Sequence, residues 1–458
     1  MDIQTEDRWL STSEICQYLS TSNDTLYRWI QSEGFPAQKI GMRWKAKKNC
    51  VDDWILQRNQ KTQGILSSQT KGAAEIGLPW EIFTNPLPKE SMCPFTHVSL
   101  FSGCGGIDLG FRQAGFRTIF ANDINEDACL TYKRNLGDIS VGDIRKIKFP
   151  EVKNVDFLSA GFPCQPFSNA GSRKGVNDER GSLYLSALDA VEKLNPRVVM
   201  FENVRGLLSS KHEGQYLIEI ICKNLDSLGY NTVFSLVDAS KHNVPQRRLR
   251  VIIIAVKRSE ENGKFAFPRI VERDDLALKN IVLDVPNTLP NQNELMQLNP
   301  QAIQIAEMIP EGGSWKDIPY EKLPPRLKKI ADNIERYHWP KFYRRFHRDE
   351  VSGTITAAFK PENAGVWHPT KRRILSVREI ARIQTFPDWF VFDGGSIKSK
   401  YQQIGNAVPP RLAYEVALQV KKVLNGEDLS KETLRTPLTA FTENARPIRD
   451  FDQNIFYP

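Results

Sequence analysis

Apolar runs of strand length alternate with amphipathic segments through the middle of the chain, and this alternation predicts the fold. Between residues 95 and 267, each apolar run is followed by a segment whose apolar positions have helical spacing. This order predicts a doubly wound, Rossmann-like α/β domain, in which helices cover both faces of a parallel sheet. The strand candidates are HVSLFS (97–102), RTIFAND (117–123), VDFLSAG (155–161), VVMFENV (198–204) and VIIIAV (251–256), and the helix candidates are 183–194 and 214–228.

The pattern changes on both sides of this domain. Residues 1–61 alternate short helical patterns with turns, whereas 62–94 are rich in Gln, Ser, Thr, Gly and Pro and indicate a linker. Over 268–372 prolines, loops and aromatic residues replace the α/β rhythm, which predicts a smaller second domain. Helical patterns return over 373–424, and a polar tail occupies 425–458.

The N-terminal segment predicts two short helices that meet at a tight turn. Ser11 followed by Glu14 is typical of a helix N-terminus, and a second helix is expected over about 23–32. The basic stretch 38–49 has a glycine at its centre, as expected of a β-wing that lies against phosphates. The segment resembles the excisionase/MerR-like winged helix-turn-helix modules in S-x-x-E-x-x-x-Y-L (11–19), T-L-Y-R-W-I (25–30) and V-D-D-W (51–54).

A DNA-binding role for this module implies contacts from the second helix and the wing. The expected side chains are Arg28, Arg43 and Lys45, since the second helix enters the major groove in such modules. The alternative is a small helical pair that serves only as a packing appendage.

Composition and charge favour a globular protein with a polyanionic partner. The 458 residues are 40% hydrophobic and 25% charged, and 62 Lys and Arg exceed 54 Asp and Glu to give a net charge of +8. The seven cysteines form no C-x-x-C pair, so no metal site is expected and a reducing cytoplasm fits. The N-terminus resembles no signal peptide and no apolar stretch reaches about 18 residues, so we expect no membrane association.

The stretch 322–348 holds nine Lys and Arg against two acids, with aromatic residues between them. Such a mixture suits phosphate contacts combined with base stacking or wedging. Lys341, Arg344 and Arg345 are the expected DNA contacts there. A solvated charged face over a small core is the alternative.

The first strand of the α/β domain runs into a glycine-rich turn, which places glycines where α/β sheets bind ligands. The dinucleotide fingerprint G-x-G-x-x-G fails, because Asp108 stands where the third glycine would be. Asp123 closes the next strand 20 residues after Gly103, which is the spacing at which an acid accepts hydrogen bonds from a ribose. Asp143 offers another carboxylate at the same edge. The order of these signals indicates a nucleoside-containing cofactor without a pyrophosphate.

A second group of reactive residues follows the later strands. Cys164 stands between Pro163 and Pro166 directly after an apolar strand, and the prolines stiffen the loop that presents the thiol. Glu202 ends the next strand, and Arg248 and Arg250 lead into the last one. A thiol, a carboxyl and guanidinium groups are therefore expected at one cleft.

Taken together, the chain resembles the bacterial-type DNA (cytosine-5)-methyltransferases. The matching blocks occur in the family's order and span about 310 residues. They are FSGCGGIDLGF (101–111), AND (121–123), GDI (142–144), GFPCQPFS (161–168), GSLY (181–184), ENV (202–204), QRRLR (246–250), SVREIARIQTFPD (376–388) and QQIGNAVPP (402–410).

The resemblance implies S-adenosylmethionine as the methyl donor and duplex DNA as the substrate. It assigns Cys164 as the nucleophile at cytosine C6 and Glu202 as the group that holds and protonates N3. Arg250 is expected near O2 with Arg248 close by, where they stabilise negative charge as it develops, and 268–372 corresponds to the target-recognition region. The implied cofactor pocket comprises Phe101, Ser102, Gly103, Cys104, Gly105, Asp123, Ile124, Asp143, Ile144, Leu183 and Asn406.

The resemblance also implies a cognate restriction endonuclease as a partner. We expect the protein to be a monomer. Two alternatives remain open from the sequence. One is an RNA cytosine-5 methyltransferase, which the recognition segment and the helix-turn-helix disfavour. The other is a DNA-binding regulator with a silent methyltransferase domain, which the intact Cys164, Glu202 and Arg250 disfavour.

Overall fold

The computed structural model divides into two compact units, Met1–Ile76 and Gly77–Pro458, which are described separately. The structure describes residues 8–19, 21, 23, 26–27, 30, 35–41, 43–51, 54, 77–152, 154–163, 181–212, 214–260, 264–271, 273–333, 343–358 and 367–429. Among the predicted site residues, Cys164, Arg28, Lys341 and the side chain of Arg43 lie outside this part of the chain.

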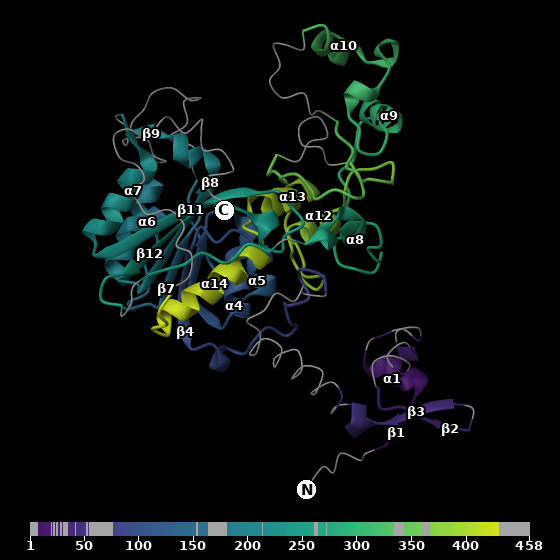
Figure 1. Ribbon diagram of the computed structural model, residues 1–458, viewed down its shortest axis with the longest axis horizontal. Coiled ribbons are helices and arrows are strands. Elements are labelled where there is room, and N and C mark those ends of the chain that lie inside the picture. Colours follow the sequence, from purple (N-terminus) through teal and green to yellow (C-terminus); the bar gives the residue numbers. More distant parts are fainter. Residues whose placement is uncertain are drawn as a thin grey trace. The chain divides into compact units, whose positions relative to one another are not determined.

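The N-terminal unit combines helix α1 (Thr12–Tyr18) with a three-stranded antiparallel sheet. The strands β1 (Trp9–Ser11), β3 (Arg43–Lys47) and β2 (Gln38–Ile40) lie side by side in that order (Figure 1). Gly41 has φ +65° between β2 and β3, a conformation that glycine adopts without strain. The β2–β3 hairpin is the basic wing that the sequence predicts.

The start of α1 has the predicted capping box. The hydroxyl of Ser11 accepts the backbone N–H of Glu14 at 3.4 Å, and the Glu14 carboxylate accepts the Ser11 N–H at 2.9 Å. These hydrogen bonds, together with the ion pair to Arg8, lower the pKa of Glu14 to about 2. A small core supports the unit and consists of Leu10, Ile15, Leu26, Phe35, Ala46 and Val51.

The larger unit is built on a seven-stranded sheet with the order β11-β12-β8-β7-β4-β5-β6 (Figure 1). Strands β7, β8, β4, β5 and β6 run parallel, whereas β12 is antiparallel to both β8 and β11. The strands are β4 (Phe95–Leu100), β5 (Phe116–Asp123), β6 (Ser140–Val141), β7 (Phe157–Ala160), β8 (Val198–Val204), β11 (Tyr230–Asp238) and β12 (Leu249–Lys257). The predicted α/β class is confirmed.

Both faces of the sheet are buried, and β8 shows why its sequence is almost entirely apolar. Val198 and Met200 pack into the core on one face, and Val199 and Phe201 pack into the core on the other. The first face is covered by α4 (Gly106–Gln113) and α14 (Pro410–Leu424), and the second by α6 (Gly181–Leu194) and α7 (Leu217–Ser227). The domain is therefore doubly wound, as predicted.

Two strands depart from the sequence-based expectation. The sequence YNTVFSLVD of β11 was not identified as a strand, because its polar positions hide the apolar pattern of an edge strand. The predicted all-parallel sheet is also wrong at β12, since β11 and β12 are joined by a short connection that returns the chain in the opposite direction.

The C-terminal segment rejoins the α/β domain and packs against its first helix. A Cβ atom on Gly110 in α4 would lie 2.6 Å from the carbonyl oxygen of Pro410 and 2.6 Å from the backbone nitrogen of Tyr414. Only glycine permits this approach, which brings α14 and the preceding α13 (Ile397–Asn406) to the start of α4.

The predicted linker 62–94 is too long at its C-terminal end. Residues from Gly77 onward belong to the larger unit, where Trp80 and Phe83 are buried. The guanidinium of Arg382 lies 5.2 Å from the Trp80 ring centroid, and the Trp389 indole donates to the Phe83 carbonyl at 3.2 Å. The proline-rich composition is typical of a linker, so the sequence does not predict that these two aromatic residues are buried.

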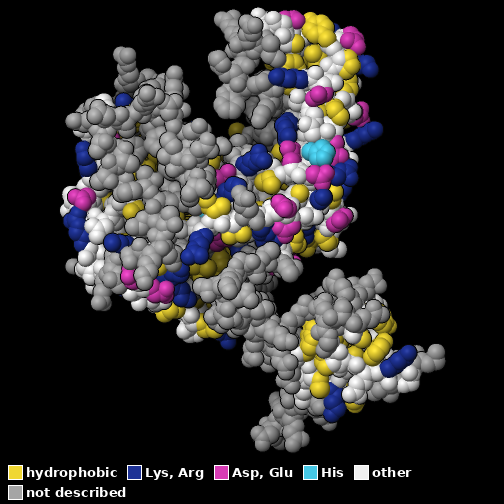
Figure 2. All heavy atoms as spheres, in the orientation of Figure 1, with side chains coloured by type: hydrophobic (Ala, Val, Ile, Leu, Met, Phe, Trp, Pro, Cys, Tyr) yellow, Lys and Arg dark blue, Asp and Glu magenta, His cyan; other side chains and the backbone are white. Residues whose placement is uncertain are grey.

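The region 268–372 contributes a helical lobe that shares its core with α12 (Val377–Ile383) and α13. Its helices are α8 (Leu278–Val282), α9 (Pro300–Met308) and α10 (Pro325–Ala331), of which α9 and α10 lie far from the sheet (Figure 1). Figure 2 shows Lys and Arg side chains on this lobe interspersed with Asp and Glu. On this face the charge is therefore mixed.

The remaining elements are short or lie at the edges of the fold. Helix α5 (Glu126–Asn135) follows β5, and the hairpin β9 (Lys211–His212) and β10 (Gln215–Tyr216) precedes α7. Across the described ranges, no helix has the length and apolar character needed to cross a bilayer.

Candidate active site

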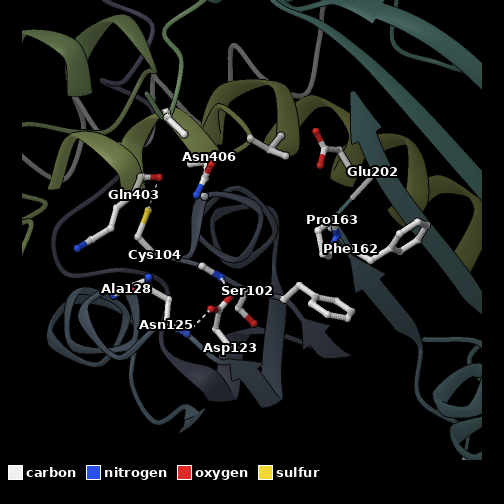
Figure 3. Close-up of a pocket in the computed structure, with 18 of the residues that line it drawn as sticks. Ser102, Cys104, Asp123, Asn125, Ala128, Phe162, Pro163, Glu202, Gln403 and Asn406 are labelled. Carbon is white, nitrogen blue, oxygen red and sulfur yellow. Dashed lines mark hydrogen bonds between the residues drawn. The ribbon is translucent and has the colours of Figure 1, made fainter. Parts of the chain in front are cut away.

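A cavity of about 700 Å³ lies at the carboxyl ends of the parallel strands (Figure 3). Its floor comes from the segments that follow β4, β5 and β7, and its upper wall from α13 and the residues after it. Parallel α/β sheets bind their ligands at this edge, because every strand there ends in a loop. Ten of the eleven predicted cofactor residues line it: Phe101, Ser102, Gly103, Cys104, Asp123, Ile124, Asp143, Ile144, Leu183 and Asn406.

The glycine-rich turn after β4 has a conformation that its sequence requires. Gly103 has φ +55° and Gly105 has φ +91°, both in the left-handed region. A Cβ atom on Gly105 would lie 2.1 Å from a methyl carbon of Leu136, so any side chain here would have to displace Leu136. Gly105 is the N-cap of α4 and is not part of the cavity lining, so its predicted role becomes one of shaping the turn.

Asp123 at the end of β5 fixes this turn. Its Oδ2 accepts the Gly103 N–H at 2.8 Å, and its Oδ1 accepts the Asn125 N–H at 2.8 Å. Burial raises the pKa of Asp123 above its usual range, and these hydrogen bonds oppose that rise. A carboxylate has more lone pairs than these two bonds use, so it retains acceptor capacity toward the cavity.

The adjoining lining combines an apolar surface with a second carboxylate. Ile124 is 67% exposed, which is unusual for so large an apolar side chain and leaves a flat contact surface at the opening. Asp143 forms a bidentate pair with Arg145, with Nε 2.9 Å from Oδ1, and this pair lowers its pKa to about 2. Asp143 is therefore ionised at every physiological pH. The surroundings suit an adenosine, which has apolar ring faces and polar edges.

Helix α13 closes the opposite side of the cavity. Gln403 and Asn406 lie across the opening from Ser102 and Asp123 (Figure 3). The Cys104 thiol contacts the Gln403 carbonyl at 3.6 Å, and burial raises its pKa well above the usual range. Cys104 is thus an inert packing residue that ties the turn to α13.

Glu202 and Arg250 occupy the other end of the same cavity. Arg250 Nε lies 2.8 Å from Glu202 Oε1, and each side chain is 12% exposed. The loop after β7 adjoins them, because the Asn203 amide donates to the Phe162 carbonyl at 3.0 Å and Pro163 lines the cavity. Cys164 follows Pro163 directly in the chain but lies outside the described residues, so its position stays a prediction.

Arg248 is placed differently from the sequence-based expectation. It is fully buried, and its guanidinium donates to the carbonyls of Ile355, Gly405 and Ala407 at 2.7–3.0 Å. Burial and the neighbouring Arg250 lower its pKa to about 9, so the side chain stays charged at neutral pH. Three of its N–H groups therefore hold backbone rather than ligand.

The segment Thr354–Ala357 also lines the cavity, and no motif in the sequence predicts it. Thr354 donates its hydroxyl to the Arg247 carbonyl at 2.8 Å, and Ser352 forms an isolated bridge with Gln246. The segment reads T-I-T-A, which carries no motif and is too general to identify a site.

The two described residues predicted to contact DNA in the larger unit, Arg344 and Arg345, lie in different environments. Arg345 is 5% exposed and donates four hydrogen bonds to backbone carbonyls, so its prediction as a phosphate contact is wrong and it holds the lobe together. Arg344 is half-buried and forms a bidentate ion pair with Glu350 at 2.6–2.7 Å. In the N-terminal unit, Lys45 lies on β3 between its partners Ser11 and Gln38.

Comparison with known families decides the assignment. A family model described as C-5 cytosine-specific DNA methylase matches residues 95–422. This chain belongs to that family. A second model, described as a helix-turn-helix domain, matches residues 9–59. Both resemblances found in the sequence are confirmed, and the chain is a DNA cytosine-5 methyltransferase with an N-terminal helix-turn-helix.

Curated relatives of this methylase are Type II methyltransferases. M.Eco47II of Escherichia coli is 32% identical over 437 residues, which cover 91% of this chain and 96% of that protein. M.NgoFVII of Neisseria gonorrhoeae is 37% identical over 341 residues, covering 72% of this chain and 87% of that protein. The M.Eco47II alignment extends beyond the methylase domain into the N-terminal unit.

A solved structure shares the fold of the methylase. It is described as a DNA modification methyltransferase encoded within an E. coli prophage, with 21% identity and a TM-score of 0.50 over 72% of this chain and 99% of that one.

A buried polar network lies beneath the glycine-rich turn of this methylase. The Ser102 hydroxyl donates to Ser99 at 2.8 Å, Ser99 donates to Asp108 at 2.8 Å, and the Tyr132 hydroxyl donates to Asp108 at 2.9 Å. Burial raises the pKa of Asp108 to about 6 and lowers that of neighbouring His97 to about 3. At neutral pH an ionised Asp108 thus faces a neutral imidazole.

This shift makes the stability of the methylase pH-dependent in a predictable direction. Because the pKa of Asp108 is raised on folding from 3.8 to about 6, its ionisation destabilises the folded state as pH rises through that range. The free energy of unfolding of Asp108→Asn minus that of wild type should therefore increase from pH 4 to pH 8, by at most about 3 kcal/mol. Urea unfolding of both proteins at several pH values measures this difference. The contributions of the other titrating groups cancel in it, because both proteins contain them. A difference that stays constant with pH would refute it.

Proposed function

We propose that this chain is a site-specific DNA cytosine-5 methyltransferase of a Type II restriction-modification system that uses S-adenosylmethionine. The observation that carries the proposal is the single cavity, which has Asp123 and Asp143 at one end and the Glu202–Arg250 pair at the other. A methyl donor and a cytosine have to meet within such a space. The curated relatives, which are named Type II methyltransferases, support the biological setting.

The residues at the first end fit an adenosine-containing methyl donor. Asp123 would accept hydrogen bonds from the ribose hydroxyls, Ile124 would contact the adenine face, and Asp143 would accept from its amino group. The open space beside Gly103, where a Cβ atom would meet no atom within 4 Å, leaves room for close backbone approach. S-adenosylmethionine, when bound, supplies the electrophilic methyl group that cytosine C5 receives.

The residues at the other end account for the activation of cytosine. C5 is a weak nucleophile until the Cys164 thiolate adds to C6 and pushes the C5–C6 electron pair toward C5. Glu202 would donate a proton to N3, and Arg250 would donate hydrogen bonds to O2, so that charge entering the ring is neutralised. After methylation, loss of the C5 proton expels the Cys164 thiolate and restores the aromatic ring.

The enclosed position of Glu202 and Arg250 supports a mechanism in which the base leaves the DNA stack. C6 is inaccessible within a duplex, so we propose that cytosine is extruded into the cavity at a cost of a few kcal/mol, which contacts with DNA offset.

The N-terminal unit would add a second DNA contact through its helix-turn-helix and the β2–β3 wing, where Lys45 lies. We propose that the enzyme acts on duplex DNA as a monomer in the cytoplasm, beside a cognate endonuclease.

Methyl transfer to defined nucleic acids tests the proposal. Purified protein with radiolabelled S-adenosylmethionine should label plasmid DNA but not tRNA, and bisulfite sequencing of DNA from expressing cells should show protected cytosines in one short sequence. Labelling of tRNA alone would contradict the proposed substrate, and labelling spread over unrelated cytosines would contradict site specificity.

A further inference from the structure

Arg248 contacts segments that are remote in sequence and meet only in the folded protein. Its Nη1 donates to the Ile355 carbonyl at 2.8 Å, and its Nη2 donates to Gly405 at 2.7 Å and to Ala407 at 3.0 Å. Arg248 itself stands immediately before β12, two residues ahead of Arg250. One side chain therefore joins three walls of the cavity.

Neighbouring polar side chains reinforce the same junction. Gln246 accepts the Ile355 N–H at 3.0 Å and donates to the side chain of Gln384 at 2.9 Å. Gln384 in turn donates to the Ile404 carbonyl at 2.7 Å. These three contacts are buried, as are those of Arg248 with Ile355 and Gly405.

The two segments are also in direct contact. A Cβ atom on Gly405 would lie 2.5 Å from the carbonyl oxygen of Thr356, so only glycine lets helix α13 approach the segment 354–357 so closely. The Arg248 guanidinium holds the carbonyls on both sides of this approach.

The cost of burying the Arg248 charge indicates what it contributes. It is fully buried and forms no ion pair with a carboxylate among the described residues, and its partners are backbone carbonyls. A buried cation is tolerated when its charge-assisted hydrogen bonds are well formed. The planar guanidinium group forms such bonds with several carbonyls at once, because its N–H groups point in fixed directions like a fork. A role in neutralising charge on the base would instead require donors exposed to the cavity, whereas the Nε of Arg248, which has no hydrogen-bond partner among the described residues, is itself buried.

We propose that Arg248 is a positioning residue that fixes the cofactor side of the cavity relative to the base side. By holding Gly405 and Ala407 it places Asn406, and by holding Ile355 it places the segment 354–357 beside Arg250. This inference rests on the proposed function, since it assumes that Asn406 faces the bound cofactor. Loss of the fork should therefore weaken cofactor binding as well as slow the chemistry.

The conservative variant Arg248→Lys separates this role from an electrostatic one, because lysine keeps the charge but cannot reproduce the planar fork. We expect its Kd for S-adenosylhomocysteine, measured by calorimetry on the full chain, to rise about tenfold. The single-turnover methylation rate should fall about 100-fold, as expected for a misplacement of about 1 Å.

Arg250→Lys is the matched control. It alters the partner of Glu202 but contacts neither Gly405 nor Ala407, so its Kd for S-adenosylhomocysteine should stay within about twofold of wild type while its rate falls. Unchanged S-adenosylhomocysteine binding in Arg248→Lys, with only the rate reduced, would overturn the proposal and return Arg248 to a role in charge neutralisation.

Gly405→Ala provides an independent variant that leaves the charge of Arg248 untouched. Its added methyl group separates α13 from Thr356, and we expect the same combined loss of cofactor affinity and rate. Thermal unfolding shows whether each variant is folded. If Arg248→Lys unfolds at a markedly lower temperature than wild type, Gly405→Ala decides instead. A folded Gly405→Ala that binds S-adenosylhomocysteine as tightly as wild type overturns the proposal. Failure of wild type to bind S-adenosylhomocysteine would overturn the proposed cofactor, and this inference with it.

Discussion

Replacing Cys164 by serine is expected to reduce methyl transfer by more than about 1,000-fold. A serine hydroxyl is not ionised at neutral pH, whereas a thiol of pKa about 8.5 is already a few per cent thiolate and is intrinsically more nucleophilic. Binding of duplex DNA and of S-adenosylhomocysteine should be unchanged, because the substitution removes no contact that either ligand needs. Single-turnover assays and equilibrium binding measure the two effects separately.

A mechanism-based trap tests the same residue directly. Duplex DNA with 5-fluorocytosine at the target cannot lose its C5 substituent as a proton, so the protein–DNA adduct should persist on a denaturing gel with wild type and be absent with Cys164→Ser. Cys50→Ser is the matched control, since Cys50 is an exposed free thiol in the other unit, and it should behave as wild type. An adduct formed by Cys164→Ser would disprove the assignment.

Replacing Glu202 by glutamine is expected to lower the methylation rate by about 100- to 10,000-fold, which is the usual contribution of a general acid or base. Glutamine has the shape of glutamate and its oxygen still accepts the Arg250 Nε–H, which now lies 2.8 Å from Glu202 Oε1. The orientation of Arg250 is therefore preserved, while the proton that N3 needs is lost. The single-turnover rate at saturating substrates isolates this step.

Glu90→Gln is a suitable control for this substitution. Glu90 also pairs with an arginine, Arg112 at 3.5 Å, but its side chain is 64% exposed and lies outside the cavity lining. Its rate should match wild type. A wild-type rate in Glu202→Gln would show that the carboxylate only orients Arg250 and transfers no proton.

Much of the cavity was predictable because its parts lie at strand ends. Asp123 ends β5, Asp143 follows β6, and Glu202 lies near the end of β8. In a parallel sheet such positions share one edge, so the order of motifs along the chain is enough to bring them together. The Ser11–Glu14 capping box was predictable for a similar reason, because both of its hydrogen bonds are local.

Burial of charged side chains was not predictable from their sequence neighbourhood. Arg345 and Arg344 are adjacent in a basic stretch, yet Arg345 is buried against four carbonyls while Arg344 pairs with Glu350 near the surface. Composition gives the charge of such a stretch but not which side chains face inward. The same limitation explains why Arg248 was expected to act on the base.

The sequence by itself determined the family, the α/β class and ten of the residues that line the cofactor end of the cavity, because apolar periodicity and ordered motifs are local properties of the chain. Only the tertiary structure decided that segment 354–357 joins the site, that residues from Gly77 onward belong to the larger unit, and that Arg248 donates to carbonyls of two remote backbone segments. Those features depend on contacts between residues more than 100 positions apart, which are selected by packing and hydrogen-bond satisfaction rather than by any pattern along the chain.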